Sequence, residues 1–118
     1  MSVRFRFENL EIWQRAAAAS DPLFDIADRM EEMKRFRWAE QLRAAVMSIT
    51  NNIAEGSGSV SNAEFAQFLN FARRSVFETA NILILLNQRG VLIERPVKLL
   101  DELEEISRMI IGFRRTLR

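Results

Sequence analysis

The chain has 118 residues and a formal net charge of +1; 48% of its residues are hydrophobic and 28% are charged. This mix is typical of one soluble domain that buries its own core, and so small a net charge gives no overall attraction to nucleic acid or membrane. Cysteine, histidine and tyrosine are absent, which excludes disulfides, Cys–His and Ser–His–Asp catalysis and the Glu-x-x-His iron sites of helical bundles. We therefore expect a single domain over residues 1–118 that is not an enzyme and has no catalytic residues, cofactor or metal.

The N-terminus reads MSVRFRFENLEIW and lacks the long apolar run and small-residue cleavage site of a secretory signal. No uninterrupted apolar run approaches the roughly 20 residues that a membrane span needs. A cytoplasmic location without a membrane partner is therefore expected.

Only two prolines and four glycines interrupt the chain, which favours long helices. Apolar residues recur at alternating steps of three and four in four successive segments, and no segment alternates as a strand would. This period predicts helices that pack side by side with left-handed crossings. We therefore predict an all-α fold, an antiparallel up-down-up-down four-helix bundle with helices at roughly 8–32, 36–55, 62–89 and 95–117.

The first predicted helix carries two adjacent apolar stripes, wider than one bundle seam needs, and Phe5 and Phe7 add large apolar area. An exposed apolar face of this kind predicts an interface with other copies of the chain. Pro22 either kinks this helix or starts a new turn. We place the end of the helix near 32–35, although no glycine or proline marks it, because a helix of about 50 residues is improbable in a small domain.

The second and third predicted helices carry polar residues where a bundle seam is expected. An antiparallel turn at Gly58 would bring Glu78 opposite Gln41 and Arg43. This favours a hydrogen-bond network that fixes the register of helices or subunits. The alternative is a carboxylate site for metal or acid–base chemistry, which lacks the partners that catalysis usually needs. The predicted network comprises Gln41, Arg43, Ser48, Asn52, Glu55, Ser75 and Glu78.

The stretch between these helices reads GSGSVSNAEF. Gly56 is expected to close the second helix with a positive φ. Ser61 and Glu64 have the S-x-x-E spacing of a capping box, and Val60 and Phe65 bracket it as a hydrophobic staple would. A phosphate-cradling loop at 56–59 is the alternative, but it lacks the strand–loop–helix context and the lysine of a P-loop.

Gly90 is expected to end the third helix as a left-handed cap, and Pro96 to sit in the first turn of the fourth. In an up-down-up-down bundle both chain ends and the 56–61 loop share one end. Cations at the end of the fourth helix suit its dipole, and a GC-rich genome also favours arginine over lysine. This end is nonetheless the predicted contact for RNA or DNA, through Arg4, Arg6, Arg114, Arg115 and Arg118.

Three stretches carry a family resemblance: FENLEIWQRA, QLRAAVMSITNNIAEGSG and EFAQFLNFARRSVFE. With them the sequence resembles the four-helix-bundle proteins encoded in intervening sequences of bacterial 23S rRNA genes, over nearly the whole chain. That family is similar to the accessory protein of diversity-generating retroelements, a pentameric barrel of four-helix bundles that pairs with a reverse transcriptase and binds nucleic acid. The resemblance implies the turn near 32–35 and a homopentamer.

Two functions are compatible with these observations. The first is a non-enzymatic homo-oligomeric interaction or scaffold protein, with five subunits implied by the resemblance. The alternative is an RNA- or DNA-binding accessory protein that acts with a nucleic-acid enzyme such as a reverse transcriptase.

Overall fold

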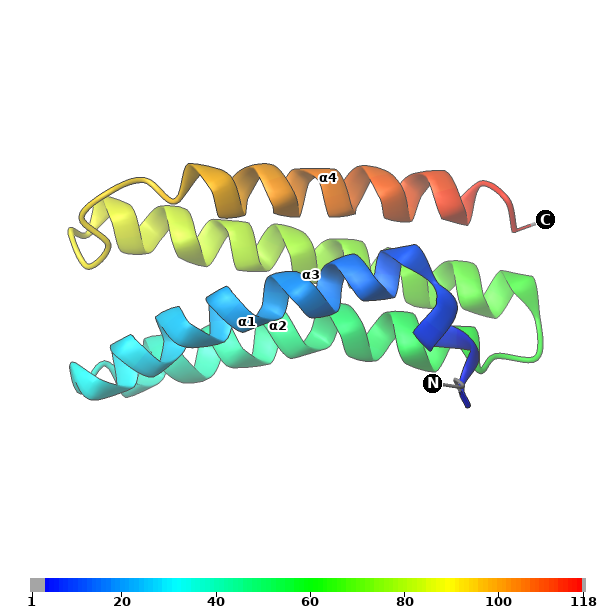
Figure 1. Cartoon of the computed structure of the whole chain (residues 1–118), viewed down its shortest axis with the longest axis horizontal. Helices are drawn as coiled ribbons and strands as arrows, with labels where there is room; N and C mark the ends of the chain where they lie inside the picture. Colours follow the sequence, from blue (N-terminus) through cyan, green and yellow to red (C-terminus); the bar gives the residue numbers. More distant parts are fainter. Residues whose placement is uncertain (1–3, 118) are drawn as a thin grey trace.

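The computed structural model describes residues 4–117, and within them the chain forms four α-helices in an up-down-up-down arrangement (Figure 1). A short 3-10 helix, η1 (Arg6–Asn9), leads into them. The α-helices are α1 (Glu11–Glu32), α2 (Phe36–Ser57), α3 (Asn62–Gln88) and α4 (Val97–Arg114). The bundle is elongated, with extents of 44 × 27 × 23 Å. The predicted all-α bundle is confirmed, and the helix bounds differ most at the two chain ends.

The two ends of the bundle are built from different segments (Figure 1). The α1–α2 turn and the α3–α4 loop lie at one end, which we call the turn end. The α2–α3 loop and both chain termini lie at the other, which we call the terminal end. Each surface feature can therefore be assigned to an end or to a flank of the bundle.

The apolar stripes of the four helices meet in one core. Both stripes of α1 face neighbours within the bundle, because α1 packs against α2 and α4. Ala27 is fully buried, and Leu10, Trp13 and Phe24 are partly buried against the core. The expectation of a wide exposed apolar face on the first helix is therefore wrong. The largest fully buried side chains include Leu23, Met30, Leu42, Ile53, Phe65, Leu69, Leu83, Leu86, Leu103, Ile106 and Ile110.

The α1–α2 turn lies where it was predicted, and its geometry explains why no local signal marks it. The N–H of Lys34 donates to the carbonyl of Glu31 (2.9 Å), and that of Arg35 donates to Met30 (2.8 Å). This is the Schellman pair of bonds that ends many helices, normally with glycine in the left-handed position. Lys34 takes that position here with a φ of 63°. α1 also runs on through Pro22, which is exposed.

The end of α3 is the same motif with the expected glycine. The N–H of Gly90 donates to Asn87 (3.0 Å) and that of Val91 donates to Leu86 (2.9 Å). Gly90 has a φ of 76°, so its predicted role as a left-handed cap is confirmed. Pro96 lies one residue before α4, as its N-cap, rather than inside the first turn.

Substitutions at the two left-handed positions, Lys34 and Gly90, are expected to change stability in opposite directions. Lys34→Gly is expected to raise the free energy of unfolding by about 1 kcal/mol, because glycine has no Cβ to strain the left-handed conformation. Gly90→Lys is expected to lower it by about 1–2 kcal/mol. No neighbouring atom lies within 4 Å of a Cβ built at Gly90, so the backbone torsion alone is tested. Urea denaturation of both variants measures this, and a loss of stability in Lys34→Gly would contradict it.

The α2–α3 connection corrects one predicted cap and confirms another. Gly56 does not take a positive φ; it lies inside α2, which ends at Ser57 and is capped by Gly58 at φ −88°. A Cβ at Gly56 would lie 2.7 Å from the Cβ of Phe68, so the glycine allows α3 to approach closely. Ser61 is the N-cap of α3, and its Oγ accepts a hydrogen bond from the N–H of Glu64 (3.1 Å). Val60 is 99% exposed, so the expected staple is not formed.

Candidate functional site

Three of the seven residues of the predicted polar network form a chain of hydrogen bonds between α2 and α3. The side-chain amide of Asn52 donates to the carbonyl and the hydroxyl of Ser48 (2.7 and 2.9 Å). The hydroxyl of Ser75 on α3 donates to the same Ser48 hydroxyl (2.7 Å). Ser75 is buried and the other two are half-buried. Small hydroxyl side chains let the two helices lie close while keeping these polar atoms satisfied.

The other four predicted members do not join this chain. Arg43 donates to Asp28 (2.7 Å) and Glu31 (2.9 Å) on α1, and these bonds raise the pKa of its guanidinium. The predicted contact between Arg43 and Glu78 is therefore wrong. Arg43 follows Gln41 by two positions, or about 200° around the helix, and so faces α1 rather than α3. Glu55 is exposed.

Gln41 and Glu78 share a shallow groove on the outer side of the α2–α3 pair. One hollow is lined by Ser48, Asn52, Phe71, Arg74, Ser75 and Glu78. A second is lined by Arg37, Trp38, Gln41, Glu78, Asn81 and Ile82. Glu78 lines both, so the hollows adjoin along the seam. This α2–α3 groove combines amides, hydroxyls and aromatic rings, the groups that protein contacts use.

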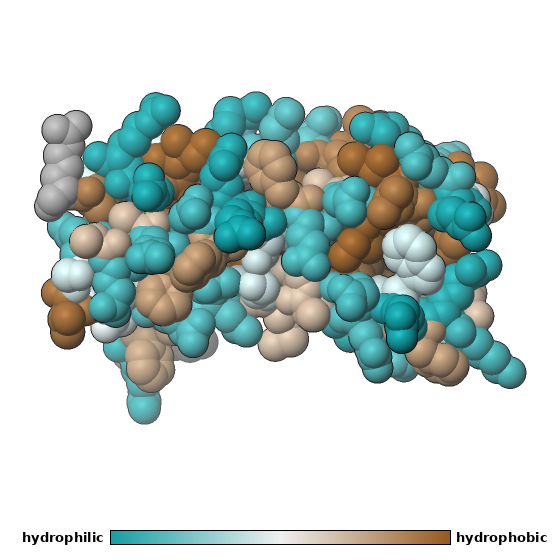
Figure 2. Space-filling view, turned by 180° about the vertical axis from the view of Figure 1, so that it is seen from behind, coloured by the Kyte–Doolittle hydropathy of each residue, from teal (hydrophilic) through white to brown (hydrophobic). Residues whose placement is uncertain are grey.

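Charged residues are unevenly distributed over the four helices. α3 has four in 27 residues and α2 has four in 22, whereas α1 has eight in 22 and α4 seven in 18. Large apolar side chains nonetheless reach the surface of the charge-poor pair, and Figure 2 shows hydrophobic groups between hydrophilic ones. On α2 and α3 the exposed ones are Phe36, Met47, Phe71, Phe77 and Leu85. Depletion of charge with exposed aromatic rings is the composition of a protein interface.

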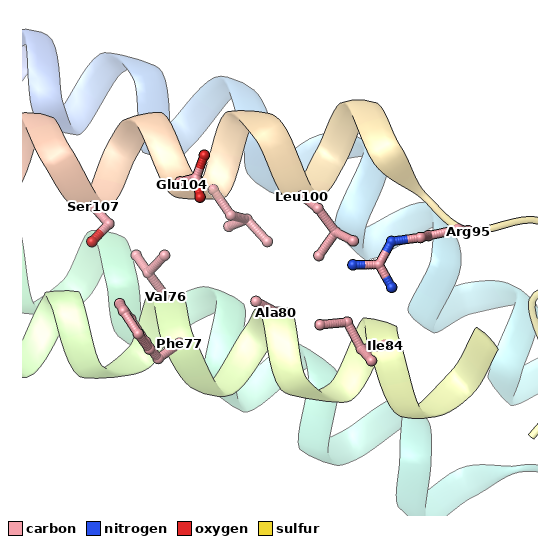
Figure 3. Close-up of a pocket in the computed structure, with 9 residues that line it drawn as sticks. Val76, Phe77, Ala80, Ile84, Arg95, Leu100, Glu104 and Ser107 are labelled. Atoms are coloured by element: carbon pink, nitrogen blue, oxygen red, sulfur yellow. The ribbon is translucent and has the colours of Figure 1, made fainter. Parts of the chain in front are cut away.

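A separate hollow, outside the α2–α3 groove, lies between α3 and α4 (Figure 3). Its volume is about 250 Å³, and apolar side chains such as Val76, Ala80 and Leu100 line most of it. The guanidinium of Arg95 reaches into it from the α3–α4 loop. Glu104 also lines this α3–α4 hollow, and its carboxylate pairs with Arg108 (3.3 Å). The hollow is thus an apolar slot with a cation at one end.

Four of the five cations predicted to meet at the terminal end are described, and all four are exposed. Two of them contact other side chains or backbone groups of the bundle. The guanidinium of Arg6 lies over the ring of Phe65, 5.1 Å from its centre. Nε of Arg114 donates to the carbonyl of Ala66 (3.0 Å). Arg4 and Arg115 are exposed, and Arg118 lies outside the described residues.

Carboxylates at the terminal end offset these cations. Glu8, Glu11, Glu55 and Glu64 all lie there, in η1 and the adjoining ends of α1, α2 and α3. Glu8 accepts hydrogen bonds from the backbone N–H groups of Phe5 and Arg4 (3.0 Å each), which lower the pKa of its carboxyl. Among the described residues, four of these arginines and four carboxylates thus lie at this end, and their formal charges balance.

The acidic side chains of the described residues are dispersed or paired with arginines. Within residues 4–117, no three acidic side chains are grouped so that they could hold a metal ion. The sequence DELEE at 101–105 carries four carboxylates, of which three are paired: Glu102 bonds Arg15 on α1, and Glu104 and Glu105 bond Arg108. The hydrogen bond with Glu102 raises the pKa of Arg15. No helix in this part of the chain is both long and apolar enough to span a membrane.

These features define a small all-α protein, a four-helix bundle whose α2–α3 flank is poor in charge. Residues 8–112 match the model of the 23S rRNA-intervening sequence protein family, and the chain belongs to that family. The family's description names no reaction. Searches among curated proteins and solved structures gave no match.

Proposed function

We propose that this protein is a homo-oligomeric interaction protein without enzymatic chemistry, whose subunits join through the flank formed by α2 and α3. The observation that supports this most is the charge distribution. Over its 27 residues, α3 carries only Glu64, Arg73, Arg74 and Glu78 as charged groups. Its exposed residues include Phe71 and Phe77, which are 39% and 57% exposed.

A closed ring requires each subunit to present two different patches, one to each neighbour. The part of the α2–α3 groove around Phe71 and the α3–α4 hollow lie on either side of the outer face of α3 and supply two such patches. Phe77 lines the hollow and Phe71 lines the groove. We propose a cyclic assembly built from these patches, with five subunits as the number that the family resemblance implies.

The test is the mass of the protein in solution. Light scattering at micromolar concentration is expected to give a multiple of the 13.7 kDa chain mass for the parent protein. The double variant Phe71→Arg, Phe77→Glu is expected to be a folded monomer, because a charge buried without a partner at an interface costs several kcal/mol. Circular dichroism verifies that the variant keeps its helices.

The matched control is Val60→Arg, which adds a charge at a residue that is 99% exposed in the α2–α3 loop. This control should assemble like the parent. A parent protein that remains a 13.7 kDa monomer at micromolar concentration would refute the proposal. An unchanged mass of the Phe71/Phe77 variant would exclude the α2–α3 flank as the interface.

A further inference from the structure

The turn end carries more exposed cations than carboxylates. Within the described chain, none of the six cations there forms an ion pair. The carboxylates at this end are Asp28, Glu31, Glu32, Glu40 and Glu94, and Arg43 already holds Asp28 and Glu31. The six cations are Arg29, Lys34, Arg35, Arg37, Arg89 and Arg95, drawn from the α1–α2 turn, the α3–α4 loop and the helix ends beside them.

Local stability explains only part of the positive charge of the segment Lys34–Arg37. A cation near a helix N-terminus opposes the helix dipole, and Arg37 lies in the first turn of α2. Lys34 and Arg35 lie between this N-terminus and the C-terminus of α1, which favours cations. The first turn of α2 contains no acidic residue to offset Arg37. Lys34 also occupies a left-handed position with a φ of 63°, where glycine would be less strained. Arg37 is therefore kept against the dipole of α2, and Lys34 is kept against the strain of its backbone conformation.

Aromatic rings lie among these charges. Phe36 stands between Arg35 and Arg37 and is 56% exposed. Trp38 is half-buried and lines the α2–α3 groove together with Arg37. Cations that alternate with exposed rings match a single nucleic-acid strand, whose phosphates bind the cations and whose unpaired bases stack on the rings.

We propose that the segment Lys34–Arg37 binds single-stranded nucleic acid, with its three cations on the phosphates and Phe36 stacked on a base. The binding is tolerant of sequence, because phosphate contacts and stacking do not read base edges. An anionic membrane or an acidic protein would use the cations but would give Phe36 no base to stack on. The surface proposed here is at the opposite end of the bundle from the arginines that the sequence pattern indicated.

The proposed ring would strengthen this binding without being required for it. Cyclic symmetry places the same end of every subunit on one face of a ring. The Lys34–Arg37 segments would then lie together and add their fields. The summation of charge over several subunits rests on the proposed assembly, whereas the binding surface of a single subunit does not. Binding and assembly are therefore measured separately.

The experiment measures fluorescence anisotropy of labelled oligouridylate and oligothymidylate against the full chain over a salt titration. The variant Lys34→Gln, Arg35→Gln, Arg37→Gln is expected to bind at least tenfold more weakly. Its slope of log affinity against log salt is expected to fall by about 2, since each phosphate contact on a single strand contributes about 0.7. Phe36→Ala is expected to lose about 5- to 100-fold in affinity through lost stacking.

Two variants at the terminal end are matched controls. Arg114→Gln, Arg115→Gln removes two cations, and Phe5→Ala removes a ring that is 62% exposed. Both are expected to bind like the parent. Light scattering on every variant separates a loss of binding from a loss of assembly, so failure of the proposed oligomer and failure of this surface give different results.

Three outcomes would overturn the proposal. The first is a parent protein that binds neither oligonucleotide at low salt. The second is a Lys34/Arg35/Arg37 variant that binds the oligonucleotides as tightly as the parent does, or that loses less affinity than the Arg114/Arg115 control. The third is binding to vesicles of anionic lipid, abolished by the same triple substitution, in a protein that binds no oligonucleotide.

Discussion

Gly56→Ala is expected to lower the free energy of unfolding by about 2–3 kcal/mol, even though alanine favours a helix by about 1 kcal/mol over glycine. A Cβ at this position would lie 2.7 Å from the Cβ of Phe68 and 2.8 Å from Cδ1 of Phe65. The first of these atoms is fixed to the backbone of α3, so relief requires the two helices to move apart. Urea denaturation at a fixed protein concentration measures the loss.

Gly112→Ala is the matched control for this substitution. Gly112 is also helical, in α4, and no neighbouring atom lies within 4 Å of a Cβ built there. This variant is expected to gain about 0.5–1 kcal/mol, since only helix propensity changes. If both glycine variants were stabilised, the close approach of α2 and α3 at Gly56 would be disproved.

Phe65→Ala is expected to destabilise the protein by about 3–5 kcal/mol, the usual loss for a fully buried phenylalanine. Phe65 is 1% exposed, and its ring lies 5.5 Å from that of Phe113 on α4. It also contacts Arg6, so one side chain joins the N-terminal segment and the ends of α3 and α4. Thermal unfolding followed by circular dichroism measures the effect.

Phe5→Ala is the control for the loss of an aromatic ring at the same end of the bundle. Phe5 is 62% exposed, although it stacks on Phe7 at 5.7 Å between ring centres. Its removal is expected to cost less than about 1 kcal/mol. Equal losses in the two phenylalanine variants would mean that Phe65 is not an anchor of the terminal end.

The architecture could be predicted because the spacing of apolar residues, which decides the buried face of each helix, is visible in the sequence itself. The α1–α2 turn was harder to predict, since its left-handed residue is Lys34 and nothing in a lysine signals a positive φ. The reverse error occurred at Gly56. Glycine can cap a helix or admit a neighbouring helix, and only the distance to Phe68 decides between them.

The sequence indicated which residues are polar or charged at the candidate surfaces, but not which residues they contact. The polar stripe of α2 correctly indicated contact with α3 through Ser48, but Arg43 was assigned to the wrong neighbour. The four described arginines near the chain ends lie at one end of the bundle, as expected. The Phe65 ring and the Ala66 carbonyl that contact two of them lie far away in sequence. In the sequence, the region of Lys34–Arg37 shows only a poorly marked helix boundary. Its position at one end of the bundle follows from the fold.

The unequal connections between the helices have a consequence for the order of folding. Only the residues Met33–Arg35 separate α1 from α2 and only Gly58–Ser61 separate α2 from α3, whereas the longer segment Arg89–Pro96 separates α3 from α4. Short loops close with little loss of chain entropy, so hairpins joined by them form early. The segment α1–α2–α3, which is joined by two short turns, is therefore the expected nucleus, in which substitutions slow refolding. Substitutions that loosen α4 should instead speed unfolding, because this helix docks last and detaches first.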